Sequence, residues 1–148
     1  MGGDRGTGRL EDFTGYMLRL AHTRAHQIAA EAFPDGPHPR EYAVLTAIAA
    51  AGPLSQQRLA ERLHVNRTLM VAVADTLERR GLVERRRDPA DRRLNAVHVT
   101  GGGRDVLERA TAVLLDANED LTRPIGEAGD RELRSLLRKL LGYPPQGG

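Results

Sequence analysis

The chain contains no cysteine and no tryptophan among its 148 residues, and aromatic residues make up only 3% of it. Without cysteine the protein cannot form disulfides, cysteine-based zinc sites or redox-active thiols. No apolar run approaches the roughly 20 residues of a membrane-spanning helix, and residues 1–9 lack the apolar stretch of a signal peptide. We therefore expect a cytoplasmic protein with no membrane partner and a core built mainly of Leu, Ala and Val.

Lysine is almost absent as well, since Lys139 stands alone beside 21 arginines. The abundance of Arg, Ala and Gly fits GC-rich coding, so the arginines gain functional meaning only where they cluster. Residues 54–104 hold 11 arginines against six acidic residues, a net charge of +5, whereas residues 1–53 and 105–148 carry −1 and −2. A basic middle between weakly acidic ends is expected when one region contacts a polyanion.

Apolar periodicity predicts four long helices, two before the break at Gly52-Pro53 and two after Thr100. The helices span about 10–32, 39–51, 104–121 and 130–141, with chain breaks at Pro124, Gly126 and Gly129. The glycines at 101–103 predict a loose helix start, because a glycine costs roughly 0.5–1 kcal/mol in a helix. The predicted domains are 1–9 (disordered tip), 10–52 (N-terminal helices), 53–100 (central lobe), 101–142 (C-terminal helices) and 143–148 (flexible tail).

The central lobe begins with a short helix, a tight turn and a second helix that runs to Arg80. Ser55 and Asn66 are suited to cap these helices, since their side-chain oxygens accept free N–H groups of a first turn. Gly81 follows as a residue that adopts positive φ cheaply. This order predicts a helix-turn-helix, whose second helix enters the major groove of DNA. The buried stripe of that helix comprises Met70, Val73, Ala74 and Leu77.

Two extended runs, 82–86 and 94–99, flank the polar, turn-rich loop 87–93. The second run alternates as a hairpin strand does. A β-hairpin with a basic loop directly after a helix-turn-helix forms a wing. The predicted fold class is therefore mainly α with a small β-hairpin wing (α+β), in which a winged helix-turn-helix lobe is joined to a lobe of N- and C-terminal helices.

These residues resemble the MarR family of transcriptional regulators. Residues 53–63 are similar to the family's third helix, 66–83 to its recognition helix and the turn after it, and 86–93 to its wing, with the Asp-x-Arg motif at Asp91 and Arg93. Val99-Thr100 followed by Gly103 is similar to the family's Leu-Thr-x-x-Gly junction. The resemblance implies an obligate homodimer, joined through the terminal helices, that represses at a pseudo-palindromic site in double-stranded DNA. It also implies release by a small-molecule effector, often a phenolic or other aromatic acid.

The resemblance assigns DNA contacts residue by residue. Arg67 and Thr68 would meet phosphates or base edges at the start of the recognition helix, where the helix dipole favours anions. Arg93 would enter the minor groove, oriented by Asp91 through a charge-assisted hydrogen bond. Arg86 and Arg92 would meet phosphates, and Gln56 would donate to the DNA backbone. The whole predicted set is Gln56, Asn66, Arg67, Thr68, Leu69, Val71, Arg86, Asp91, Arg92 and Arg93.

Leu69, Val71 and Ala72 depart from the family, many members of which place Thr, Ser or Arg at these positions. Ala72 cannot make a bidentate contact to guanine, although Leu69 or Val71 can contact a thymine methyl group. We therefore expect more reliance on the wing, on phosphates and on DNA shape. The alternative is a winged-helix protein-interaction module in which sequence-specific DNA binding is weak or lost.

In the family the effector binds between the dimerisation lobe and the winged lobe. Tyr16, Arg19, His22 and Tyr42 are the candidate ligand-binding residues on this reading. His22 and His26 have the i, i+4 spacing of metal ligands, but two ligands without a third do not make a site. We expect no metal and no cofactor.

No catalytic constellation is found in the sequence. Ser55 and His64 lack a nucleophile elbow and a third triad member, and the glycines at 101–103 lack the Lys-Ser/Thr of a phosphate-binding loop. We therefore expect a protein that is not an enzyme.

Overall fold

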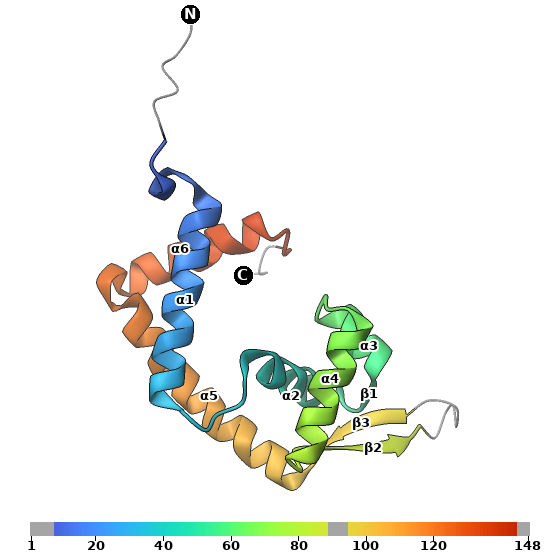
Figure 1. Ribbon diagram of the computed structural model, residues 1–148. Helices are drawn as coiled ribbons and strands as arrows, with labels where there is room; N and C mark the ends of the chain where they lie inside the picture. Colours follow the sequence, from blue (N-terminus) through green and yellow to red (C-terminus); the bar gives the residue numbers. More distant parts are fainter. Residues whose placement is uncertain (1–7, 89–94, 145–148) are drawn as a thin grey trace, which may run out of the picture. The chain divides into compact units, whose positions relative to one another are not determined.

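The computed structural model describes residues 8–88 and 95–144, and the chain forms two compact units. The winged unit comprises residues 35–113, and the helical unit comprises residues 1–34 together with 114–148. In chain order the elements are η1 (Leu10–Asp12), α1 (Thr14–Ala32), α2 (Pro39–Ala51), β1 (Leu54–Ser55), α3 (Gln56–Arg62), α4 (Arg67–Arg79), β2 (Val83–Arg87), β3 (Asn95–Val99), α5 (Gly101–Thr122), η2 (Arg123–Ile125) and α6 (Gly126–Leu140) (Figure 1). The predicted fold class is confirmed. None of the described helices has the length and apolar character needed to cross a bilayer.

The winged unit encloses a hydrophobic core of its own. Leu45 of α2, Leu59 of α3, Leu77 of α4 and Val97 of β3 are completely shielded from solvent. The sequence boundaries grouped α2 with the N-terminal helices, but its apolar residues pack into the same core as the helix-turn-helix and the wing. This helix therefore supports α4 directly.

The sheet of the winged unit has three antiparallel strands in the order β1-β3-β2. Strands β2 and β3 form the predicted hairpin, in which Val83 lies opposite Val99 and Arg87 opposite Asn95. Strand β1 is an addition to the prediction, since a strand of two residues shows no alternation in the sequence. Leu54 pairs with Val97, which fastens the start of α3 to the base of the wing.

Short-range hydrogen bonds set the ends of the helix-turn-helix. The Oγ of Ser55 accepts the N–H of Arg58 at 3.3 Å, and the Oδ1 of Asn66 accepts the N–H of Leu69 at 2.8 Å. Gly81 adopts a φ of +68° just beyond α4, a conformation that glycine reaches without steric cost. All three predicted helix ends are thus confirmed.

The junction between β3 and α5 is tight. Helix α5 begins at Gly101, and Thr100 Oγ1 accepts the N–H of Gly103 at 3.0 Å while it donates to the carbonyl of Gly81 at 2.6 Å. A Cβ atom at Gly103 would lie 2.0 Å from the carbonyl oxygen of Leu82. The prediction of a loose helix start was wrong, because this glycine allows α5 to pack directly against the turn that follows α4.

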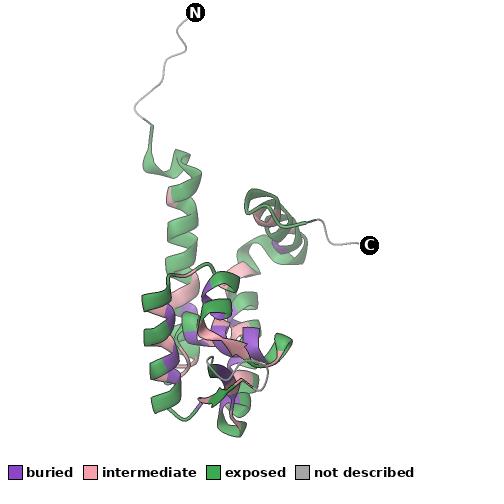
Figure 2. Ribbon diagram, turned by 90° about the vertical axis from the view of Figure 1, so that its right-hand side faces the viewer, coloured by how far each residue is buried: buried purple, intermediate pink, exposed green. Residues whose placement is uncertain are grey.

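The helical unit comprises α1, the second part of α5 and α6. Helix α1 begins only at Thr14, because Phe13 is extended and separates it from η1. Helix α6 begins at Gly126 rather than near residue 130, and Gly129 lies inside it instead of breaking it. Ile28 and Ala117 are the only buried apolar residues among those described in this unit, a contrast with the winged unit that Figure 2 displays.

Candidate nucleic-acid interface

The N-terminal end of α4 is open to solvent and positively polarised. Arg67 and Thr68 are exposed, and Asn66 caps the helix. Arg67 forms no ion pair with any residue that the structure describes. Helix N-termini attract anions through their free N–H groups and the helix dipole. This end of α4 is therefore suited to a DNA phosphate.

The second half of α4 is occupied by contacts within the protein. Arg85 of β2 forms ion pairs with both Asp75 and Glu78, and its N–H donates to Glu78 Oε1 at 3.2 Å. Partial burial acts to lower the pKa of Arg85, but the hydrogen bonds and charges of the two carboxylates outweigh it and raise the pKa. The guanidinium thus stays charged, offsets one of the two negative charges and ties the wing to the recognition helix.

Strand β2 divides its arginines between two faces, since successive side chains of a strand alternate. Arg86 lies on the face opposite Arg85 and pairs with Glu84. Arg87 shares the face by which Arg85 reaches α4, is exposed, and has no ion pair among the described residues. Arg86 stays a predicted phosphate contact, and strand alternation together with the position of Arg85 adds Arg87 as a second candidate.

The remaining predicted DNA contacts differ in their exposure to solvent. Val71 is exposed, whereas Leu69 is half-buried. The Nε2 of Gln56 is buried and has no hydrogen-bond partner in the part of the chain that the structure describes, so the amide would have to turn outward to reach a phosphate. The predicted wing-tip contacts Asp91, Arg92 and Arg93 lie outside the described residues.

A pocket of about 180 Å³ lies between α2 and the start of α4. A cavity of roughly 150 Å³ can hold a benzene ring, so this one has room for a single aromatic ring. Its walls are apolar apart from Arg40, and one of them is formed by α4 itself. The lining residues are Pro39, Arg40, Ala43, Val44, Leu63, Val65, Leu69, Met70 and Val73.

The predicted ligand-binding residues fall in different units. On α1 in the helical unit, the guanidinium of Arg19 lies 4.9 Å from the ring centre of Tyr16, and His22 meets the ring of His26 edge-on at 4.7 Å. In the winged unit, the hydroxyl of Tyr42 on α2 forms a hydrogen bond of 3.0 Å with Thr111 on α5. Among the described residues, no three His, Asp or Glu side chains gather as a metal site would require.

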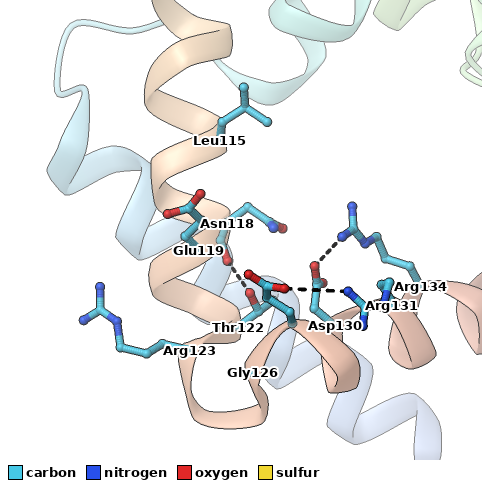
Figure 3. A pocket seen from close by; sticks show the side chains of 10 residues that line it. Leu115, Asn118, Glu119, Thr122, Arg123, Gly126, Asp130, Arg131 and Arg134 are labelled. Carbon is cyan, nitrogen blue, oxygen red and sulfur yellow. Dashed lines mark hydrogen bonds and ion pairs between the residues drawn. The ribbon is translucent and has the colours of Figure 1, made fainter.

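A second hollow, of about 640 Å³, lies where α5 turns into α6 (Figure 3). Two of its three acidic residues are paired with arginines, since Asp130 pairs with Arg134 and Glu127 lies 3.7 Å from Arg131, and Glu119 and Arg123 add one charge of each sign. Leu115 contributes an apolar side chain that is 64% exposed. These balanced charges do not favour an anion or a cation, so this hollow is a weak candidate for a ligand site.

Comparison with known proteins identifies one family. The model described as "MarR family" matches residues 38–94, which include α2, the helix-turn-helix and β2. A putative transcriptional regulatory protein for the hcr operon of Thauera aromatica is 30% identical over 135 residues. The match covers 90% of this chain and 81% of that protein.

Solved structures extend the likeness over nearly the whole chain. A probable transcriptional regulator from Pseudomonas aeruginosa is 30% identical with a TM-score of 0.84, over 89% of this chain and 99% of that one. The transcriptional repressor CouR, bound to a 23-mer DNA duplex, is 31% identical with a TM-score of 0.83. This match covers 94% of this chain and 99% of CouR. CouR has also been solved with p-coumaroyl-CoA bound. That structure gives a TM-score of 0.82 at 28% identity, and the match covers 93% of this chain and 98% of that one.

Proposed function

Because the chain belongs to the MarR family of transcriptional regulators, we propose that it is a homodimeric repressor that binds a pseudo-palindromic operator in double-stranded DNA and is released by a small ligand. The observation that carries this proposal is the combination, in one compact unit, of an open cationic helix end and a basic wing strand. CouR, which shares the fold, has been solved on a DNA duplex.

The DNA-facing surface is built from α4 and β2. Arg67 and Thr68 approach phosphates and base edges at the start of α4, with Asn66 alongside as the cap. Arg87 adds a cation on the strand face that looks toward α4. Arg93, with Asp91 and Arg92, extends the contact to the wing tip, as the family resemblance implies. Phosphate contacts fix register, while base contacts supply specificity.

The helical unit is the proposed dimer interface. Leu133, Leu136 and Leu140 lie along one stripe of α6 and are between 42% and 63% exposed. Phe13 and Met17, near the start of α1, are similarly open. Apolar surface of this extent marks an interaction site on a soluble chain. A second copy of the chain covers it in our proposal and places two winged units on the two operator half-sites.

The proposed effector is a small aromatic acid or its thioester. The pocket between α2 and α4 has room for one aromatic ring, and Arg40 at its wall can pair with a carboxylate. A ligand there would contact α4 directly and bias its position. The assignment of Tyr16, Arg19, His22 and Tyr42 as ligand contacts stays a prediction from the family resemblance. CouR binds p-coumaroyl-CoA, an aromatic thioester.

The experiment is a binding titration on duplexes enriched from a random pool by the full chain, repeated at several salt concentrations. We expect affinity to fall steeply with salt, as it does when arginines displace counterions from phosphates. Arg67→Ala should weaken binding to all sequences and lower the salt slope by about one for each protomer. Arg123→Ala, which removes a charge from the helical unit, is the matched control and should change neither. Binding that ignores salt, or equal losses in the two variants, would refute the proposal.

A further inference from the structure

The exposed face of α4 carries two apolar residues, Val71 and Ala72. Val71 and Ala72 lie three and four residues after Thr68, and Asp75 lies four and three residues after them, which places the four residues on one side of the helix. All four are exposed. Val71, at 37% exposure, is the only exposed large apolar residue among those described in the winged unit. Its exposure is unusual, because the other large apolar side chains that the structure describes in this unit are at least partly buried.

The polar side chains farther along this helix are already engaged within the protein. Asp75 is held by Arg85, which also holds Glu78. The hydroxyl of Thr76 donates to the carbonyl of Ala72 at 2.9 Å and accepts from Arg79 at 3.0 Å. The two carboxylates also repel phosphates from this half of the helix. DNA is therefore met by the first half of α4, where Val71 and Ala72 follow Thr68.

We propose that Val71, supported by Ala72, recognises the C5 methyl group of a thymine in the major groove of each half-site. The inference rests on the proposed DNA binding and specifies what α4 reads. The thymine methyl is the one apolar group that the four base pairs present in this groove. Guanine, adenine and cytosine present donors and acceptors there, and a valine pressed against these groups would leave them without partners. The site therefore favours thymine by attraction and disfavours the other bases by desolvation.

The test replaces each thymine of the enriched duplex in turn by 2′-deoxyuridine, which differs only by the missing methyl group. We expect one thymine in each half-site at which the full-length protein loses about fourfold in affinity, the effect of one buried methyl-sized group. Exchanging that base pair for 5-methylcytosine·guanine or for cytosine·guanine gives a second pair of probes. Of these two duplexes, the protein should bind the methylated one more tightly.

The variant Val71→Ala connects this effect to the side chain. It should bind the thymine and uridine duplexes equally, and thermal melting should show that it folds, since Val71 lies on the surface. Val113→Ala, the same truncation on α5, should keep the wild-type sensitivity.

Two outcomes overturn the inference alone: wild-type protein that binds its duplex but ignores every uridine, or Val71→Ala that keeps the wild-type profile. Failure to enrich any duplex, or binding without salt dependence, would instead refute the proposed function, and this inference with it.

Discussion

The two units of the chain differ in what stabilises them. Among the described residues, 15 of the 17 buried apolar residues belong to the winged unit, whereas 12 of the 13 exposed large apolar residues belong to the helical unit. The winged unit can thus bury its apolar surface within one protomer. The helical unit cannot, because its helices present more apolar surface than they cover. The difference shows that the winged unit has a core of its own, and it supports the proposal that the helical unit forms the interface with a second copy of the chain.

Truncating the winged core should have the largest effect. Leu77 on α4 is fully buried, so Leu77→Ala removes packed atoms and leaves a cavity. We expect a loss of about 2–5 kcal/mol in the free energy of unfolding. Denaturant titrations at several protein concentrations measure it, and the size of the loss should be the same at each concentration. A loss that vanishes at high concentration would mean that the winged unit also depends on a partner.

The helical unit should respond in the opposite manner. Leu136 on α6 is 55% exposed in the protomer, so Leu136→Asp disturbs little within one chain. In a dimer it would bury a carboxylate, and we expect the dissociation constant to rise about 30-fold or more, the effect of losing an interface hot spot. Sedimentation equilibrium measures this constant. Ser135→Asp places the same charge on the neighbouring position of α6 and serves as the control. Equal dissociation constants for the two variants would mean that the dimer interface lies elsewhere.

Features of the winged unit that depend on neighbouring residues could be predicted from the sequence. Ser55, Asn66 and Gly81 act on residues within a few positions of themselves, and the structure confirms each of them. The stripe of α4 was also predictable. Leu69 lies four residues before Val73, so helical periodicity alone places it at the border of the buried side, whereas Val71 falls on the open side.

Features that depend on distant contacts could not be predicted. The ion pairs of Arg85 with Asp75 and Glu78 join β2 to α4, and no local pattern indicates them. The glycine run at 101–103 indicates a weak helix start until the carbonyl of Leu82 is known to lie against Gly103. In each case a residue that local rules count as unfavourable is explained by a neighbour in space.

The smallest predicted effect concerns Asn66, where one substitution should change the stability of the winged unit and another should change only its affinity for DNA. Asn66→Ala removes the oxygen that accepts the N–H of Leu69, and we expect a loss of about 1 kcal/mol in the free energy of unfolding. Asn66→Asp keeps an equally good cap and adds a negative charge that the helix dipole favours, so its stability should match that of the wild type. The same charge would face DNA phosphates, so this variant should bind the operator more weakly, most clearly at low salt. Thermal melting and binding titrations on the two variants decide the point. Wild-type affinity in a stable Asn66→Asp protein would show that DNA does not approach the N-terminus of α4.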